Sequence, residues 1–186
     1  MTDDDLLKAL KALHEHTDET LRRDFDRSLS FQDGMFDRWE RAKRLGFGED
    51  ASIYNSSLVY GEVTVGAGTW IGPNTLLEGN HGGIAIGHHC SISAGVQVYT
   101  HDTVMWSLSG GREPKRKGRV EIGDCTYIGS QTIVALGVTI GSHCVIAANA
   151  FVNRDVPDNS IVGGTPARPI GTVEISGDNI SLRYDR

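Results

Sequence analysis

The chain has 186 residues and a formal net charge of −6 at pH 7, which suits one soluble domain with a continuous core. This acidic balance argues against a general nucleic-acid partner, and no apolar run approaches the roughly 20 residues needed to span a bilayer. The chain begins Met-Thr-Asp-Asp-Asp and lacks the basic start and apolar stretch of a signal peptide, so we expect a cytoplasmic protein.

Residues 1–50 are expected to form an N-terminal helical cap. Leucines at 6, 7, 10 and 13 make an apolar stripe behind acidic residues that suit the start of a helix. A second helical stretch is expected around residues 18–29, and a third from Asp33 to Gly46. Such a segment usually covers the exposed end of a sheet; a partner-binding first helix is the alternative.

An aliphatic residue recurs at every sixth position through most of residues 51–163. This spacing fits neither the 3.6-residue period of a helix nor the two-residue period of a strand. It fits a chain that turns a corner every six residues, as in a parallel β-helix. Three sides make an 18-residue coil, so we predict a mainly β protein of about five coils. The repeat positions are Ile53, Val59, Val65, Ile71, Leu77, Ile86, Ile92, Val98, Ile122, Ile128, Val134, Ile140, Ile146 and Val152.

Two further features follow the same rhythm. Glycine comes directly after six repeat residues, where a corner needs unusual backbone angles or a close approach of chains. The fourth residue after a repeat residue is usually small, which predicts a second inward position. Cys90 and Cys144 fall there and Cys125 falls at a turn, so neither disulfides nor a zinc site are expected from these thiols.

The rhythm breaks three times, and all three breaks fall at one corner. Nine residues separate Leu77 from Ile86, 24 separate Val98 from Ile122, and nine separate Val152 from Ile161, which is thereby assigned to side three. Each break lies between sides two and three. Insertions in repeat proteins gather on the binding face, and the inward position there would be taken by polar residues, His81 and Asp102. The functional site is therefore expected at this corner.

His101 opens the longest insertion, an inserted loop at 101–119. Histidine accepts and returns a proton near pH 7 and suits a general base. Glu78 and Asp102 either orient this imidazole, bind an acceptor or are simply solvated. The basic residues of 112–119 are either a solvated face or a phosphate-binding segment. Trp106 is either a lid or a hydrophobic anchor for the loop, and the histidines at 88, 89 and 143 fall at ordinary corners.

The repeats, the loop opening YTHD and the run IGDCTYIGS…GGTPARPI resemble the hexapeptide-repeat acyltransferases. Residues 51–170 look most similar to the sugar O-acetyltransferases of maltose, galactoside and surface-polysaccharide type. Residues 164–186 leave the repeat and are expected to form a C-terminal cap. The resemblance implies that the repeat region, 51–163, is a left-handed parallel β-helix. It also implies a homotrimer whose active sites lie between subunits and bind acetyl-CoA.

The resemblance also assigns residues. His101 matches the catalytic histidine, and the acetyl-CoA contacts match Tyr127, Ser130, Ala148, Asn153, Arg154, Thr165 and Arg168. A second basic residue often found in the family is replaced by Gly171. The acceptor is expected to contact Glu78, Asn80, His81, Asp102 and Trp106, although the stretch EGNHGG differs from the acidic stretch of the galactoside and maltose enzymes.

These features predict transfer of an acetyl group from acetyl-CoA to a sugar hydroxyl, in surface-polysaccharide biosynthesis, with His101 as general base. The first alternative is N-acetylation of a nucleotide-linked amino sugar, with the basic segment holding the diphosphate. A zinc enzyme that hydrates carbon dioxide requires three histidines from neighbouring coils, and only His81 and His101 share a corner. The remaining alternative is a β-helix that serves only as a scaffold.

Overall fold

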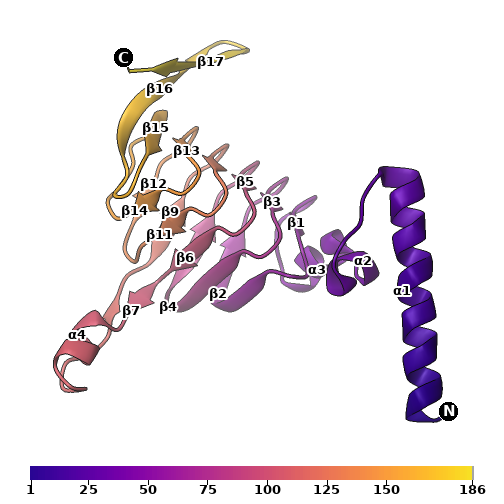
Figure 1. Cartoon of the computed structure of the whole chain (residues 1–186). Coiled ribbons are helices and arrows are strands. Elements are labelled where there is room, and N and C mark those ends of the chain that lie inside the picture. The colour runs from indigo at the N-terminus through magenta and orange to yellow at the C-terminus, as the bar shows by residue number, and fades with distance from the viewer. Residues whose placement is uncertain (186) are drawn as a thin grey trace.

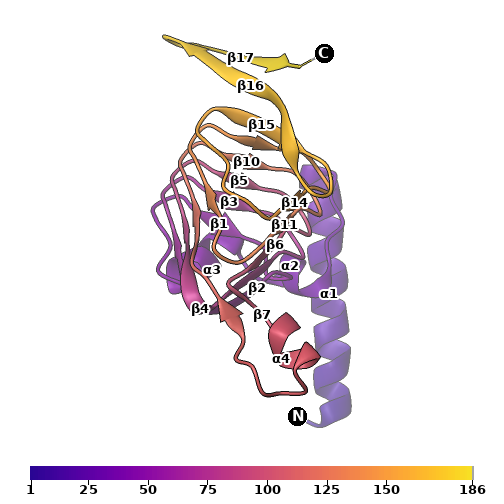
Figure 2. The same cartoon turned by 90° about the vertical axis from the view of Figure 1, so that its left-hand side faces the viewer.

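The structure, a computed structural model, describes residues 1–185 and is a parallel β-helix with appendages (Figures 1 and 2). Side one is a sheet in which one short strand from each coil pairs in parallel with the strand of the next coil. These strands are β1 (Ser52–Ile53), β3 (Trp70–Ile71), β5 (Ser91–Ile92), β10 (Tyr127–Ile128), β13 (Val145–Ile146) and β15 (Ser160–Gly163).

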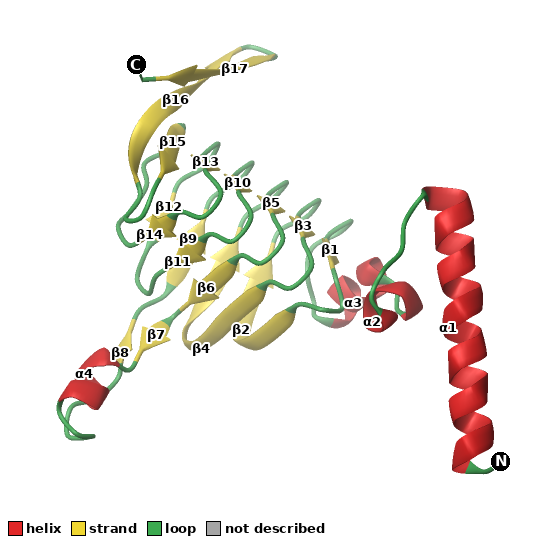
Figure 3. Cartoon of the chain, viewed as in Figure 1, coloured by secondary structure: helices red, strands yellow, loops and turns green. Residues whose placement is uncertain are grey.

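Sides two and three share a second sheet, because two strands run through the corner between them without a break. These two are β2 (Leu58–Val65) and β4 (Leu76–Ile86). Side two is completed by β6 (Gln97–Tyr99), β11 (Ile133–Val134) and β14 (Phe151–Val152), and side three by β9 (Val120–Ile122) and β12 (Thr139–Ile140). Loops join the short strands throughout (Figure 3).

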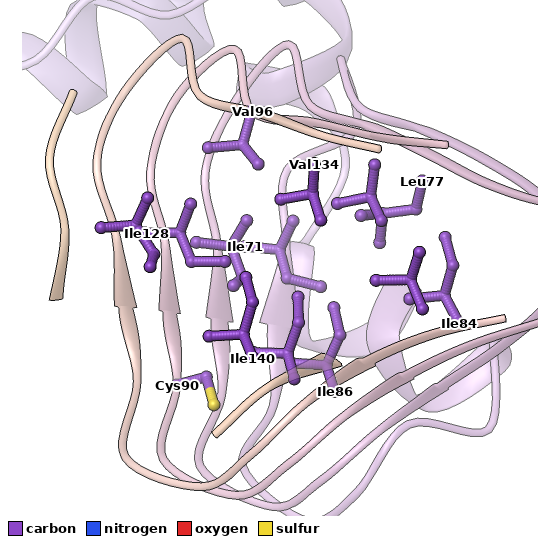
Figure 4. Close-up of a cluster of buried hydrophobic side chains, with 14 of the residues drawn as sticks. Ile71, Leu77, Ile84, Ile86, Cys90, Val96, Ile128, Val134 and Ile140 are labelled. Atoms are coloured by element: carbon purple, nitrogen blue, oxygen red, sulfur yellow. The ribbon is translucent and has the colours of Figure 1, made fainter. Parts of the chain in front are cut away.

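The six-residue rhythm corresponds to the core, as predicted. Every repeat residue except Val59 is buried, and the residues of each side are register partners, as in Ile71↔Ile92 and Leu77↔Val98. The second inward position is also confirmed, with Thr69, Cys90 and others buried there. Figure 4 shows part of this apolar core, with repeat residues such as Ile71, Leu77 and Ile128 and the second inward residues Cys90 and Val96 all inside the coils.

The glycines after the repeat residues serve close approach rather than unusual angles. A Cβ on Gly129 would lie 2.5 Å from the backbone nitrogen of Ala148 in the next coil, and one on Gly66 would lie 2.6 Å from the carbonyl carbon of Gly87. The left-handed backbone comes two residues later, as at His89 (φ 52°) and Cys125 (φ 55°). Cys125 therefore lies at a turn, as expected.

The assignment of Ile161 to side three is wrong. Val156 takes that place and pairs with Ile140, whereas Val162 pairs with Ile146 on side one. Only four residues therefore separate Val152 from the next inward residue. The last irregularity does fall at the expected corner, but it shortens the corner instead of lengthening it.

The N-terminal helices differ from the expectation. The first two stretches form one helix, α1 (Asp3–Phe25), followed by α2 (Phe31–Met35) and α3 (Arg38–Arg44). The first coil is covered by α3 and the segment after it, where Ala42 and Phe47 join the core. Helix α1 stands away from the coils with its leucine stripe exposed (Figure 1). No helix of residues 1–185 has the length and apolar character to cross a membrane.

Two appendages complete the fold. The inserted loop forms an arm of β7 (His101–Asp102), α4 (Val104–Leu108) and β8 (Arg116–Lys117), in which β7 and β8 pair antiparallel. At the other end, β16 (Arg168–Ser176) and β17 (Asn179–Tyr184) form a hairpin that extends the side-one sheet beyond its last coil (Figure 1).

Candidate active site

The corner between sides two and three brings Glu78 and His101 into contact. Glu78 follows the buried Leu77 in β4, and its register partner in the next coil is Tyr99, two residues before His101. His101 Nδ1 lies 2.6 Å from Oε2 of Glu78. The side chain of Glu78 is 8% exposed and that of His101 is 22% exposed. A carboxylate oriented by the fold therefore holds one nitrogen of the loop histidine.

Thr100 fastens this pair to the barrel, and no expectation from the sequence included it. Its hydroxyl is fully buried and donates to the carbonyl oxygen of Glu78 at 2.7 Å. The hydroxyl oxygen of Thr100 also accepts a hydrogen bond from the backbone N–H of His81, at 3.1 Å. The two insertions are thus joined by a side chain next to His101. Counting one coil onward from Glu78 reaches its register partner Tyr99, and Thr100 is the next residue. The repeat spacing could therefore have indicated Thr100.

The electrostatics of the pair favour a charged carboxylate. Burial alone would raise the pKa of Glu78, but hydrogen bonds from His101 and Asn80 outweigh it and lower that pKa below its ordinary value. An ionised carboxylate can only accept hydrogen bonds. Nδ1 of His101 is then the donor, which leaves Nε2 as the nitrogen with a free lone pair. This is the tautomer that a general base requires.

His81 lies against His101 rather than in the core. The two ring centroids are 4.4 Å apart with the rings edge to face. Partial desolvation lowers the pKa of His81, and nearby His101 and Lys117 lower it further. The expectation that His81 and Asp102 replace inward residues is wrong, because Ile84 and Val120 fill those positions, counting back from side three.

Asp102 orients the arm instead of the imidazole. Its carboxylate forms an ion pair with Arg116 across the β7–β8 pair and accepts from the backbone N–H of Val104. The hydrogen bond from Arg116 lowers the pKa of Asp102. Lys117 is the register partner of His101, so the arm sets positive charge beside the histidine pair. Trp106 lies in α4 on the projecting part of the arm and is half exposed.

An open groove of about 420 Å³ leads away from His101 along the outer face of side two. Its apolar wall comes from Tyr99, Ile133 and Phe151, each on a successive coil. The far end reaches the GGTPAR segment, since the backbone N–H of Phe151 donates to Gly164. A long, partly apolar ligand can therefore lie in the groove with one end at His101.

The residues expected to contact acetyl-CoA fall into separate places in one chain. Asn153, Arg154 and Arg168 line a small pocket of about 130 Å³, at the same corner as His101 but farther along the axis. At the corner between sides one and two, the Thr165 hydroxyl donates to the carbonyl of Asn149, whose N–H donates to Ser130, and Ala148 precedes Asn149. Tyr127 is exposed on the outer face of side one. Side two therefore separates the group around Arg154 and Arg168 from the group around Thr165 and Ser130.

Metal-ligand geometry is absent from the corner as the structure describes it. Within residues 1–185, no three histidine, cysteine or acidic side chains are placed to hold one ion. His143 and His89 lie at other turns in left-handed conformation.

Comparison with known proteins finds matches for two parts of the chain. Residues 119–154 match the model "Bacterial transferase hexapeptide (six repeats)", and residues 62–100 match "Hexapeptide repeat of succinyl-transferase". Protein CapG of Staphylococcus aureus is 41% identical over 93 residues, covering 49% of this chain and 54% of CapG. The putative acetyltransferase YvoF of Bacillus subtilis is 35% identical over 91 residues, covering 49% of each. The chain spans about half the length of these relatives.

Two solved structures share the fold. The acetyltransferase VCA0836 of Vibrio cholerae, complexed with acetyl-CoA, is 26% identical with a TM-score of 0.62, covering 90% of this chain and 89% of that one. The N-acyltransferase AntD of Bacillus cereus, in complex with dTDP and 3-hydroxybutyryl-CoA, is 22% identical with a TM-score of 0.62, covering 74% and 90%. The fold is the left-handed parallel β-helix of hexapeptide-repeat proteins. Two parts of the chain thus match models of hexapeptide-repeat transferases, and the chain is similar to acetyltransferases of that kind.

Proposed function

We propose that the protein transfers an acetyl group from acetyl-CoA to a sugar hydroxyl, with His101 as general base. The observation that carries this proposal is the 2.6 Å contact between His101 Nδ1 and the buried carboxylate of Glu78. That contact leaves Nε2 to take the hydroxyl proton, and the carboxylate stabilises the imidazolium that results.

The chemical step balances within this site. As the acceptor oxygen attacks the thioester carbonyl carbon, its proton passes to Nε2 of His101. The tetrahedral intermediate then expels the CoA thiolate, which takes a proton back from the imidazolium. A backbone N–H at a coil corner would stabilise the oxyanion. Holding both reactants in one groove supplies a large part of the acceleration.

Acetyl-CoA would run along the groove walled by Tyr99, Ile133 and Phe151, with its phosphates near Arg154 and Arg168. The remaining expected contacts lie on other faces of the chain. A homotrimer with sites between subunits would let Tyr127, Ser130, Ala148 and Thr165 of one subunit face the groove of another. The acetyl-CoA complex of VCA0836 supports the identity of the donor.

The acceptor would enter at the corner and contact Asn80, His81 and the arm with Asp102 and Trp106. Lys117 beside His101 favours one second candidate, N-acetylation of a nucleotide-linked amino sugar. AntD, whose structures contain dTDP sugars, is an example of such chemistry on this fold. A panel of hydroxy sugars, amino sugars and their nucleotide-linked forms separates the two candidates.

The test measures thiol release from acetyl-CoA across that panel. His101→Ala is expected to lower kcat by about 10²- to 10⁴-fold, the usual contribution of a general base. His16→Ala is the matched control, because His16 is exposed on α1. Full turnover by the His101→Ala variant would refute the assignment.

A further inference from the structure

Thr100 lies where three segments of the chain meet, and its backbone is held from two sides. Its N–H donates to the carbonyl oxygen of Glu78 in the preceding coil. Its own carbonyl accepts from the N–H of Gly118, where the arm returns to the barrel. Thr100 is also fully buried. With the backbone fixed and no solvent around the side chain, the hydroxyl has little freedom of direction.

The hydroxyl of Thr100 contacts both residues that flank the imidazole of His101. Its oxygen lies 3.2 Å from Oε2 of Glu78, which is the carboxylate oxygen that lies 2.6 Å from His101 Nδ1. The backbone N–H of His81 donates to the same hydroxyl at 3.1 Å, and the ring of His81 lies edge to face with that of His101. A displacement of this hydroxyl would therefore move both neighbours of the imidazole.

The orientation of the Glu78 carboxylate depends on the donors around it, because the terminal torsion of a glutamate is broad. Oε1 accepts from the backbone N–H of Asn80 at 3.3 Å. Oε2 faces the Thr100 hydroxyl and His101 Nδ1. Without that hydroxyl, His101 would be the only donor to Oε2 within residues 1–185. The imidazole would then orient the carboxylate as much as the carboxylate orients the imidazole.

We propose that Thr100 is a positioning residue for the general base. Its hydroxyl fixes the Glu78 carboxylate and His81 against the imidazole, and so keeps the ring proton of His101 on Nδ1. The expected effect on rate rests on the proposed function, whereas the state of the imidazole can be measured without turnover. Because a misplacement of about 1 Å can cost about 100-fold in rate, a hydroxyl that touches no substrate can still govern kcat.

Thr100→Val tests the proposal, because valine keeps the shape of the side chain and removes the hydroxyl. Its kcat for thiol release is expected to fall about 10- to 100-fold, with KM for acetyl-CoA unchanged, and Thr100→Ser should restore most of the rate. Thr69→Val is the matched control and should keep the kcat of the wild type. Thr69 is also fully buried, donates to the carbonyl of Gly87 at 2.8 Å and accepts from the N–H of Cys90 at 3.0 Å, at the corner between sides three and one.

Nitrogen-15 NMR of the histidine rings is the second measurement and needs no acyl transfer. The signals of His101 are identified by their absence from His101→Ala. At a pH where the imidazole is neutral, the wild type should carry the ring proton on Nδ1. Thr100→Val should show a mixture of the two tautomers, while Thr100→Ser and Thr69→Val keep the spectrum of the wild type.

Either a wild-type kcat or a wild-type tautomer in Thr100→Val would overturn the proposal, as would a Thr100→Ser variant as slow as Thr100→Val. If His101→Ala keeps full turnover, the proposed function fails and the tautomer alone decides the role of Thr100. Amide exchange in the wild type covers a Thr100→Val variant that does not fold. The His81 amide should exchange slowly because its acceptor is buried, and rapid exchange would contradict the proposal.

Discussion

Replacing Glu78 by glutamine should impair catalysis while leaving the fold intact. Glutamine keeps the shape of the side chain and an oxygen that accepts from Nδ1 of His101, but it removes the negative charge. The lost charge lies 2.6 Å from the imidazole on a nearly buried side chain, where solvent screens little. A hydrogen bond to a charged group is worth about 1.5–3 kcal/mol. If most of that is realised only when His101 carries the proton, kcat/KM should fall by about 10- to 150-fold.

The assay is thiol release from acetyl-CoA, with the best acceptor, for the wild type and for Glu78→Gln. Glu121→Gln serves as the matched control, because Glu121 pairs with Arg119 on the outer face of side three. Thermal unfolding of both variants checks that the fold is retained. A Glu78→Gln enzyme with the kcat/KM of the wild type would refute the inference that this carboxylate orients and stabilises the base.

Two further predictions concern the barrel. Burial raises the pKa of the Cys90 and Cys144 thiols, so at pH 8 both should stay protonated and unreactive while the exposed Cys125 reacts. A chromogenic disulfide reagent should therefore titrate one thiol per native chain and three after denaturation. Rapid labelling of three thiols in the native protein would contradict this burial. Ile128→Ala should cost about 2–5 kcal/mol in urea unfolding, because Ile128 is fully buried. Ile133→Ala on the outer face of side two should cost less than about 1 kcal/mol, and equal losses would show that the inward assignment is mistaken.

The fold could be predicted from the sequence because its period is a direct consequence of geometry. One inward residue per side, repeated over three sides, leaves a rhythm that no helix or flat sheet produces. The rhythm assigned Ile71, Ile92 and Ile128 to one side, and they are neighbours in one sheet. It failed at Ile161, because a corner can be shortened as well as lengthened and spacing alone does not tell which residue resumes the count.

The site was only partly predictable, for a related reason. The breaks in the rhythm identified the corner and placed Glu78, His81 and His101 there. The path of an insertion, however, depends on pairing between neighbouring loops, which leaves no periodic trace. The role of Thr100, and the pairing of Asp102 with Arg116 across the arm, follow from those local contacts.

For the N-terminal helical segment, the sequence predicts the secondary structure but not where the helix packs. The leucine stripe correctly indicated a helix, but amphipathicity does not say which surface the apolar face meets. The first helix was expected to cover the end of the coils. Helix α1 instead stands away from them, and α3 covers the first coil.

A crystal structure of the protein with acetyl-CoA tests the central claim most directly. The account predicts electron density for the pantetheine arm along the groove of Tyr99, Ile133 and Phe151. The thioester carbonyl should lie close enough to His101 Nε2 for an acceptor oxygen to sit about 3 Å from both. Acetyl-CoA bound on another face, with its thioester remote from His101, would contradict it.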